Sequence, residues 1–566
     1  MAKKRKKEQS LDKVSVEEVK VTPDGLLDRL VFWLKIPENF LFLTLLLVHL
    51  IAIWIFKYIP TSDGPTHIET AEIISNYSKQ ELYQKFFYFN KNLGANWLGH
   101  LLLVLLLKFL PPLVAEKVLI SGYVILFPIS VRYALSKIKV ETTFLALLSF
   151  PFIFNSLFDF GFFYFCYSSV VYFFTIGFWL KQREAFTFKA AFTLSLLALL
   201  LYLTHLFSLM AASLTIAVMS IWFTLADLKK GADQQSLKRA FISRAVIPFL
   251  SFLPAVLMVL GFISNKSSYG RNLGDQKSDL LYYLLYLEPL LSYGTNDDWE
   301  GKLARLLFGV IASVFLYLIF SKLFSNSWQL LDGLFWLVPT FLLLYYLLPS
   351  EAFSGGLIKE RAALYFFLVS FFWLAAQHYS KLVKTLIESL LVFISLSMLI
   401  EQHIKWTELN GYIEEYVSVT DSIEPNKIVL PITLSAYVLP DGTRVSSNIP
   451  PFIHLSSYVV WQKDLINLAN FEAHSYHFPI RYRPEVDPHK LVGKEVEKNR
   501  PSSLEILSYK NSTGYEIDYV IVWGMPNDPR VMQHPAFQQI GNQLQQGYSL
   551  TYSSSRGLVK LFRRKK

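Results

Sequence analysis

The sequence predicts a mainly α-helical, polytopic membrane protein with about eleven transmembrane helices, in-plane helices on the outer face and a small extracytoplasmic α/β domain. Three observations predict this fold class. Of 566 residues, 53% are hydrophobic and only 17% are charged, which is too apolar for an ordinary soluble protein. Leu, Phe and Tyr gather in runs close to the roughly 20 residues that cross a bilayer. From Glu401 onward, Pro, Asn, Asp and His become frequent and short strand-like runs appear.

The N-terminal segment, residues 1–36, is predicted to be cytoplasmic. It opens with a basic stretch, Lys3 to Lys7, and a polar stretch follows, so no cleavable signal is evident. The first apolar run, from about Phe40 to Tyr58, is long enough to remain in the bilayer as an anchor. The net charge of +10 lies largely in short clusters between apolar runs and at both ends, as orientation in a membrane requires, so nucleic-acid binding is not indicated. A single cysteine, Cys166, excludes an intrachain disulfide framework.

The transmembrane domain is predicted to span residues 37–400. After the first span, ten further spans are expected at about 114–136, 141–157, 161–180, 189–204, 206–224, 240–263, 303–322, 330–348, 362–379 and 384–400. This assignment places five basic clusters on the cytoplasmic side: Lys137/Lys139, Lys181/Arg183, Lys229/Lys230/Lys238/Arg239, Lys322 and Lys381/Lys384.

Residues 60–112 are predicted to form one outer-face segment of in-plane helices. The apolar run 97–110 has about 14 residues and ends at Pro111-Pro112, which is too short for a full crossing. Residues 401–566 follow an odd number of spans, so we expect this α/β domain to be extracytoplasmic. Long domains translocate largely regardless of charge, so its basic end does not oppose this placement.

The motif Ser-Asp63-Gly-Pro-Thr-His67 lies where the first span gives way to an in-plane helix. Pro near the first position of a helix is a start signal, so one interpretation is that Asp63 only caps this helix. The alternative is chemical, because ionisable groups at a membrane boundary are costly unless they are paired or face water. His67, Asp159, His205, Glu351 and Arg361 are predicted at similar depth on the outer face. A cavity with chemistry is therefore expected there, with Asp63 and Asp159 as acid–base or metal-binding carboxylates.

Each of the other candidates also has a structural interpretation. Asp159 could hydrogen-bond the backbone of its own turn, and His100 and His205 could be structural donors. Arg361, with Lys359 beside it, could hold a phosphate bidentately or could simply extend to the headgroups from a helix end. Lys266 and Arg271 are further cationic candidates in a polar loop. In the outer domain, His474 and His477 have a His-x-x-His spacing that could ligate zinc, although no second pair is obvious.

These features together resemble the membrane-embedded glycosyltransferases of the GT-C superfamily, in particular bacterial members related to the protein-mannosyltransferase and aminoarabinose-transferase group. The residues that carry the resemblance are Asp63 in its motif, the segment Asn96-Trp-Leu-Gly-His100, the helix entry Ala115-Glu116-Lys117, and Asp159 at the second outer turn. Two features depart from the family: a single Asp followed by Gly replaces the acidic pair of many relatives, and the outer domain matches no familiar sugar-binding module.

The resemblance implies a hexosyl- or pentosyltransferase in the bacterial inner membrane that acts in cell-envelope glycosylation. It would use a polyprenyl-phosphate-linked sugar, a glycan, lipid or protein acceptor, and surrounding membrane lipids, with no nucleic acid. By similarity, Asp63 is the catalytic carboxylate, Asp159 is the second acidic residue, and a divalent cation (Mg or Mn) could bind at both. His67, Glu69, His100, His205, Lys359 and Arg361 are the expected substrate-binding residues.

Two other functions remain open from the sequence. A transporter or flippase for a lipid-linked or anionic substrate would also gather charges in a cavity, although no inverted-repeat symmetry is visible. A scaffold within an envelope-polysaccharide complex would use the charged turns only structurally. The sequence has no Walker loop, dinucleotide fingerprint or Gly-x-Ser-x-Gly elbow, so it lacks the marks of ATP-driven transport and of common hydrolases.

Overall fold

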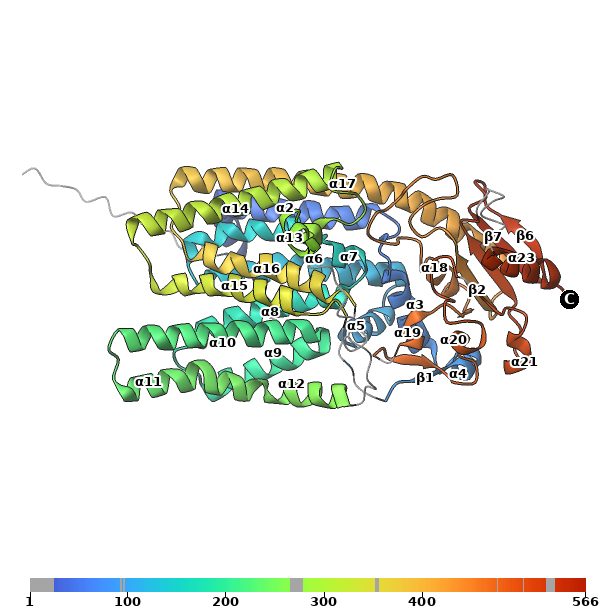
Figure 1. The fold of residues 1–566 in the computed structure, drawn as a ribbon, viewed down its shortest axis with the longest axis horizontal. Helices are drawn as coiled ribbons and strands as arrows, with labels where there is room; N and C mark the ends of the chain where they lie inside the picture. Colours follow the sequence, from blue (N-terminus) through green and yellow to red (C-terminus); the bar gives the residue numbers. More distant parts are fainter. Residues whose placement is uncertain are drawn as a thin grey trace, which may run out of the picture.

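A computed structural model describes residues 25–91, 94, 97–264, 278–351, 356–475, 477–501, 503–525 and 535–566 of the chain. Within these ranges the protein is mainly helical, with a small sheet region at its C-terminal end (Figure 1). The basic stretch Lys3 to Lys7, Asn96, Lys266 and Arg271 lie outside the described residues.

Nine helical segments of the described chain are long and apolar enough to cross a membrane. Five of them are single helices: α2 (Pro37–Ile55), α6 (Pro112–Ser136), α8 (Phe163–Gln182), α10 (Leu206–Lys229) and α14 (Trp299–Ser325). Two combine a 3-10 helix with a following α-helix: η1 (Val140–Phe152) with α7 (Ser156–Asp159), and η4 (Leu330–Trp336) with α15 (Leu337–Leu347). The last two are Gln234–Ile263, formed by α11 (Gln234–Phe241), η2 (Ile242–Val246) and α12 (Ile247–Ser264), and Lys381–Ser422, formed by α17 (Lys381–Val417) and η5 (Ser418–Ser422). The chain is therefore a multi-pass membrane protein.

Two further helices occupy the remaining predicted spans without meeting the same criteria. Helix α9 (Phe188–Thr204) is apolar but has only 17 residues. Helix α16 (Ile358–Ala375) is buried along most of its length, but Lys359, Glu360 and Arg361 place three charges in its first turn. Every predicted span thus coincides with a helix in the described chain, and nine of these helices have the length and composition of a crossing.

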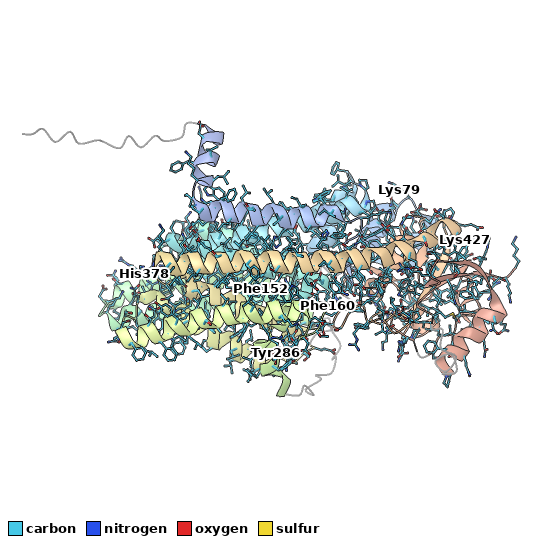
Figure 2. All side chains as sticks on the ribbon, turned by 90° about the horizontal axis from the view of Figure 1, so that it is seen from above. Lys79, Phe152, Phe160, Tyr286, His378 and Lys427 are labelled. Atoms are coloured by element: carbon cyan, nitrogen blue, oxygen red, sulfur yellow. The ribbon has the colours of Figure 1, made fainter. Side chains whose placement is uncertain are left out.

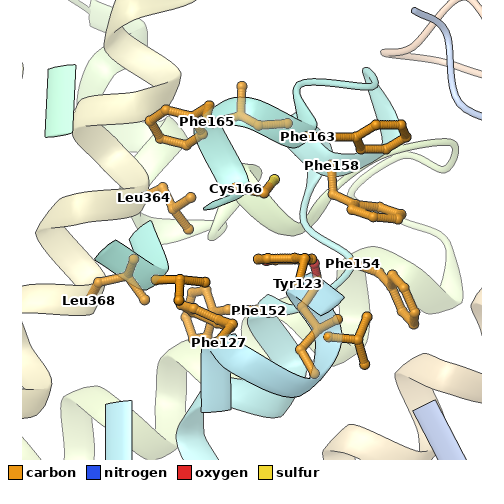
Figure 3. Close-up of a cluster of buried hydrophobic side chains, with 14 of the residues drawn as sticks. Tyr123, Phe127, Phe152, Phe154, Phe158, Phe163, Phe165, Cys166, Leu364 and Leu368 are labelled. Atoms are coloured by element: carbon orange, nitrogen blue, oxygen red, sulfur yellow. The ribbon is translucent and has the colours of Figure 1, made fainter. Parts of the chain in front are cut away.

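The interior of the bundle is packed with aromatic side chains. Figure 3 shows Tyr123, Phe152, Phe158 and Cys166 in one cluster, and Leu364 of α16 is among the residues that close it. In a bilayer, packing and dispersion stabilise such contacts, because lipid tails are as apolar as the side chains themselves. This packing fixes the turn that follows α7.

Short helices lie between the first two crossings, as the sequence predicts for residues 60–112. They are α3 (Gly64–Asn76), α4 (Glu81–Phe86) and α5 (Trp97–Leu107). At about 1.5 Å per residue, the 11 residues of α5 cannot cross the roughly 30 Å of hydrocarbon. Helix α5 packs against α3, α6 and α9 instead.

The C-terminal region contains a five-stranded mixed sheet of order β3-β2-β5-β7-β6. The strands are β2 (Ile428–Thr433), β3 (Ile466–Asn467), β5 (Tyr519–Trp523), β6 (Tyr548–Ser553) and β7 (Val559–Arg564), and short helices α18 (Ser456–Val460), α19 (Phe471–His474), α20 (Pro488–Leu491), α21 (Tyr509–Thr513) and α23 (Pro535–Gly547) accompany them. Strands β2 and β5 are buried along their whole length, as their continuous apolar sequences require of inner parallel strands.

The sheet region and the membrane half are joined at two places. Strand β1 (Phe87–Phe89), from the segment between the first two crossings, pairs antiparallel with β4 (Ile480–Tyr482) of the C-terminal region. Helix α17 continues without a break past residue 400 to Val417, because Trp406, Leu409 and Ile413 bury a second apolar face beyond its membrane section. Figure 2 shows this helix running from the end near His378 toward Lys427.

In Figure 1 the sheet and α11 lie at opposite ends of the long axis. The remaining elements of the described chain are α1 (Leu26–Leu34), α13 (Ser278–Leu285) and η3 (Glu288–Leu290), of which η3 packs near α7. The site described next lies between these ends, where α3, α7, α18 and α19 meet.

Candidate active site at the junction of membrane helices and C-terminal region

Two turns that are far apart in sequence are hydrogen-bonded side by side at this junction. The Ser62 amide donates to the Asp159 carbonyl at 3.0 Å, and the Asp63 amide donates to the Phe160 carbonyl at 2.9 Å. Gly161 allows the approach: its φ is +92°, and a Cβ there would lie 2.6 Å from the Gly64 nitrogen. The backbone thus brings Asp63 and Asp159 into neighbouring turns.

This approach predicts a specific cost for Gly161→Ala. The variant must adopt a left-handed conformation and also accommodate a methyl group against the Asp63 turn. Gly442 offers a matched control, because its φ is +91° but a Cβ would meet nothing within 4 Å. We expect Gly442→Ala to lose roughly 1 kcal/mol of unfolding free energy, and Gly161→Ala to lose about 1–3 kcal/mol more, measured by SDS titration in mixed micelles. Equal losses would contradict the close approach.

Asp63 occupies the N-cap position of α3, but its side chain makes no capping hydrogen bond. The carboxylate faces His454 instead, with Oδ1 3.7 Å from Nε2, and 17% of the side chain is exposed. Burial raises the pKa of Asp63 to about 7, and the nearby Glu472 carboxylate adds to the shift while His67 opposes it. Burial also lowers the pKa of His454 to about 4, so this imidazole is neutral at pH 7. Asp63 is therefore poised to exchange a proton near neutral pH.

Behind Asp63, Glu472 of α19 joins His67 and His100 in a buried triad. The Glu472 carboxylate accepts from His67 Nδ1 at 2.5 Å and from His100 Nε2 at 2.9 Å. His67 Nε2 lies 2.9 Å from the Gly161 carbonyl oxygen. Since a carboxylate and a carbonyl only accept, both nitrogens of His67 must carry protons, so this ring is an imidazolium. The triad thus places a positive charge one helical turn from Asp63.

The electrostatics of the triad agree with this assignment. Burial alone would raise the pKa of Glu472, but His100 and His67 outweigh it and hold that pKa well below the usual range. Burial would likewise lower the pKa of His67, but Glu472 and Asp63 raise it above the ordinary value. Ligands around a zinc ion at about 2.1 Å are roughly 3.4 Å apart. The 2.5 Å contact between His67 and Glu472 is shorter than this separation and is a hydrogen-bond distance.

Glu69 is buried between α3 and the C-terminal region. Its carboxylate accepts from Ser457 at 2.6 Å and from Asn467 and Asn470 at 2.8 Å each. Burial raises the pKa of Glu69 to about 7 despite these three donors. The contacts fasten α3 to the C-terminal region and hold the carboxylate away from solvent.

Asp159 is fully buried, and its carboxylate turns toward partners that Asp63 does not contact. Oδ1 accepts from Gln402 at 2.9 Å and from Tyr293 at 3.3 Å, whereas Oδ2 has no hydrogen-bond partner in the described chain. A cavity of about 20 Å³, room for about one water molecule, is lined by His49, Glu300 and Gln402 among others, but neither Asp63 nor Asp159 lines it. The turns of the two acids adjoin while their side chains diverge.

Arg361 lies on the other side of the same turn. Its guanidinium stacks over Phe162 at 5.0 Å and over Phe165 at 5.5 Å. One nitrogen donates to the Gly356 carbonyl, whereas Nε has no hydrogen-bond partner among the described residues. Lys359 lies in the same helical turn and is also buried.

His205 approaches Arg361 through Phe165, whose ring centroid lies 5.2 Å from that of His205. The Nδ1 atom of His205 accepts from the Phe207 amide at 3.1 Å and so caps α10. Burial lowers the pKa of His205 well below its ordinary value, and Arg361 adds to the effect. At neutral pH this ring is uncharged and can donate a hydrogen bond only through Nε2.

The structure therefore divides the predicted residues into two groups around the turn 159–162. Asp63, His67 and His100 gather on one side with His454 and Glu472, and Arg361, Lys359 and His205 gather on the other. Sequence reasoning missed Glu472 and the facing role of His454. No local pattern marks them, since Glu472 contacts a histidine 405 positions earlier in the chain.

Comparisons with known proteins leave the family of this chain open. No protein-family model matches the sequence, and no curated protein matches it. Among solved structures, the chain is similar to ArnT from Cupriavidus metallidurans bound to undecaprenyl phosphate, with 8% identity and a TM-score of 0.45. The alignment covers 95% of this chain and 98% of that one. Because both identity and TM-score are low, the argument for function below rests on the residues of the site.

Proposed function

We propose that this protein is an integral-membrane glycosyltransferase that moves a hexosyl or pentosyl group from a polyprenyl-phosphate-type lipid to an acceptor at the outer face of the bacterial inner membrane. One observation carries the proposal. Asp63 is a partly exposed carboxylate directly beyond the first crossing, with 17% of its side chain exposed, whereas its neighbours Glu69, Asp159 and Glu472 are fully buried. A lipid-borne sugar is confined to this boundary, so a base that serves it must lie there too.

The transfer is a single displacement in which Asp63 is the general base. Asp63 takes the proton of the acceptor hydroxyl as that oxygen forms its bond to the anomeric carbon. The bond between the anomeric carbon and the phosphate oxygen breaks, and the lipid phosphate leaves with the electron pair. Attack opposite the leaving group inverts the anomeric centre. The acceptor can be a glycan, a lipid or a protein, since the reaction requires only a hydroxyl.

The charged residues behind Asp63 support this role. His67 carries a positive charge that favours the ionised form of Asp63, while burial and Glu472 favour the neutral form. The balance keeps Asp63 basic enough to accept a proton and ionised often enough to act near pH 7. His454 is neutral and faces the carboxylate, so it can orient a hydroxyl without adding a charge.

Arg361 is the proposed phosphate-binding residue of the donor. Its Nε lacks a partner in the described chain, although buried guanidinium nitrogens normally find an acceptor. A phosphate oxygen supplies this acceptor and receives the negative charge left by bond breaking. Arg361 and Asp63 flank the same turn, through Phe162 and Phe160 respectively, which suits a donor whose phosphate and sugar contact different sides of it.

A divalent cation shared by Asp63 and Asp159 is not supported by this arrangement. The two carboxylates face different partners, and Asp159 Oδ1 is already engaged by Gln402 and Tyr293. The proposed steps therefore use only the side chains of this chain, and Asp159 acts by holding the turn that supports Asp63.

The donor site predicts a selective loss of lipid binding. Charge-assisted hydrogen bonds contribute about 1.5–3 kcal/mol, so Arg361→Gln should bind undecaprenyl phosphate about 10- to 100-fold more weakly than wild type. Binding of the radiolabelled lipid to protein in detergent measures the effect. Arg305→Gln is the matched control, because Arg305 also donates to one carbonyl and stacks on one tyrosine at 5.4 Å, yet lies outside the site.

Two results would contradict the proposal. Equal binding by both variants would remove Arg361 from the donor site. A wild-type protein that binds the lipid phosphate but transfers sugar from none of the available polyprenyl-phosphate sugars to any hydroxyl acceptor would exclude a transferase and favour a transporter.

A further inference from the structure

Helix α19 presents two rings at the surface, next to the site described above. Asn470 caps this short helix by accepting from the Ala473 amide at 3.0 Å. Ala473 and Glu472 are buried, and Glu472 belongs to the triad behind the proposed general base. Phe471, in contrast, is half-buried, and the side chain of His474 is 44% exposed. Because they are three positions apart in a helix, these two rings lie on the same side of α19.

The first ring, that of Phe471, adjoins Asp63 through His454. The centroids of the Phe471 and His454 rings are 4.7 Å apart, and His454 Nε2 lies 3.7 Å from Asp63 Oδ1. Phe478 contacts the Phe471 ring edge-on, with centroids 5.7 Å apart. Two neighbouring rings thus hold Phe471 in place beside a carboxylate that is itself partly exposed.

The second ring, that of His474, stacks on His489. The two centroids are 3.6 Å apart and the ring planes are 16° from parallel, so their nitrogen lone pairs do not converge on the zinc ion that the spacing of His474 and His477 suggested. His489 is held between two carboxylates: Nε2 donates to Glu497 at 2.7 Å, and Nδ1 lies 3.6 Å from Asp487 Oδ1. Burial alone would lower the pKa of His489, but Asp487 and Glu497 raise it to about 9, so this ring is positively charged at neutral pH.

Glu497 is fixed by His489 but remains accessible. Its side chain is 26% exposed, and only its Oε2 atom accepts a hydrogen bond within the described chain. Its charge also acts on the proposed active site. Burial is the main cause of the raised pKa of Asp63, and Glu497 is among the carboxylates that add to it. Burial lowers the pKa of His454, and Glu497 opposes that shift. A fixed carboxylate is therefore available to accept a hydroxyl within electrostatic reach of Asp63.

Rings and carboxylates arranged in this way match the chemistry of a saccharide. A sugar ring has C–H groups on its faces, which pack on aromatic side chains, and hydroxyls around its edge, which donate to carboxylates. Asp63 and Glu497 are two separate acceptors, and Phe471 and His474 are two separate rings. A lipid alcohol or a serine side chain offers a single hydroxyl and would leave one acceptor without a donor, whereas a saccharide satisfies both.

We propose that the acceptor of the transfer is a saccharide and that Phe471, His474 and Glu497 bind it. The Phe471 ring packs on the face of the acceptor sugar, whose attacking hydroxyl points to Asp63. The neighbouring sugar packs on the exposed His474 ring and donates to Glu497. The inference rests on the proposed transferase function and narrows its acceptor from any hydroxyl to a glycan. The three residues determine acceptor specificity and take no part in the bond exchange.

Saccharide binding can be measured without sugar transfer. Asp63→Asn protein in lipid nanodiscs, free of sugar-headed detergent, is observed by saturation-transfer difference NMR with a panel of disaccharides of hexoses, N-acetylhexosamines, 6-deoxyhexoses and pentoses, and with N-acetylserine amide and octanol. At least one disaccharide should bind, and more tightly than its monosaccharide. Adding Phe471→Leu, which removes the ring but keeps an apolar side chain, should weaken this binding about 3- to 10-fold, whereas Phe471→Tyr should retain it. Glu497→Gln should weaken it about 3- to 10-fold as well.

Matched controls separate this inference from the proposed function. Phe562 is also half-buried but lies on β7, near the C-terminal end of the long axis in Figure 1, so Phe562→Leu should bind the disaccharide normally. Phe471→Leu should bind undecaprenyl phosphate as wild type does. A signal from the serine amide or octanol and from no saccharide, or saccharide binding that Phe471→Leu and Glu497→Gln leave unchanged, would overturn the inference and leave the transferase proposal standing. Saccharide binding that depends on Phe471, in a wild-type protein that transfers no sugar, would support the saccharide site and count against the transferase.

Discussion

Replacing Asp63 with Asn should lower the turnover of sugar transfer by about 10²- to 10⁴-fold, the usual contribution of a general base. The fold should survive, because the Asp63 side chain caps no helix and Asn is nearly isosteric. Single-turnover transfer from a polyprenyl-phosphate sugar, with lipid binding followed in parallel, separates the chemical step from donor affinity. We expect lipid affinity to change little, because Arg361 and not Asp63 is placed at the phosphate.

The pH dependence gives this prediction a second readout. A general base must be ionised, so kcat/KM should rise with pH and inflect near the Asp63 pKa of about 7. His454 cannot cause this rise in kcat/KM near pH 7, since burial lowers the pKa of His454 to about 4. Glu69 also has a pKa of about 7 but is sealed from substrate, so Glu69→Gln is the control and should retain the inflection. The residual rate of Asp63→Asn should show no inflection near pH 7.

The alternatives from the sequence predict different results. A scaffold has no turnover to lose, and Asp63→Asn would leave its partners bound. A transporter would show lipid or anion movement across proteoliposomes that persists in Asp63→Asn with an altered pH dependence. A wild-type transferase activity that survives Asp63→Asn within about tenfold would contradict the general-base assignment.

Removing the Glu472 carboxylate should be the most destabilising single change at the junction. Glu472→Ala leaves the His67 imidazolium buried without its partner and leaves the Nε2 donor of His100 unpaired. Breaking a buried ion pair in this way costs about 3–5 kcal/mol of unfolding free energy. SDS titration in mixed micelles measures the loss, and Glu81→Ala is the control, because Glu81 is an exposed carboxylate whose loss should leave the midpoint unchanged.

The pKa shifts of Glu472 and His67 determine how the unfolding free energy changes with pH. Glu472 has a lowered pKa, so its contribution is present above the ordinary glutamate pKa and is lost as pH falls through the folded value. His67 has a raised pKa, so its contribution is present below about pH 6.5 and is lost as pH rises through the folded value. Burial raises the pKa values of Asp63 and Glu69 to about 7, so both groups weaken the fold as pH rises from the ordinary carboxyl range, about 4, to about 7.

The difference between wild type and Glu472→Ala therefore isolates the triad. This difference in unfolding free energy should be largest at pH values where Glu472 is ionised and His67 is protonated. It should shrink as pH rises well above 6.5, where His67 loses its proton. A difference that grows with pH, or a loss no larger than that of Glu81→Ala, would contradict the charged triad.

The sequence by itself determined the membrane class, the positions of the helices and the place of Asp63 at the end of the first crossing. These properties depend on local composition: an apolar run of about 20 residues must span, a run of 11 to 14 ending in proline must not, and Gly-Pro after Asp63 starts a helix. The positions of Asp159, Arg361 and His205 near the ends of helices follow from the same reasoning.

Only the tertiary structure decided what each charged side chain faces. The pKa of Asp63 depends on burial and on Glu472, which lies about 400 positions later in the chain. Burial and neighbouring charges arise from contacts between segments that are distant in the chain, and the periodicity of the sequence does not show these contacts. For the same reason the sequence paired Asp63 with Asp159 as neighbouring acids, whereas the folded turns lie side by side with their carboxylates directed to different partners.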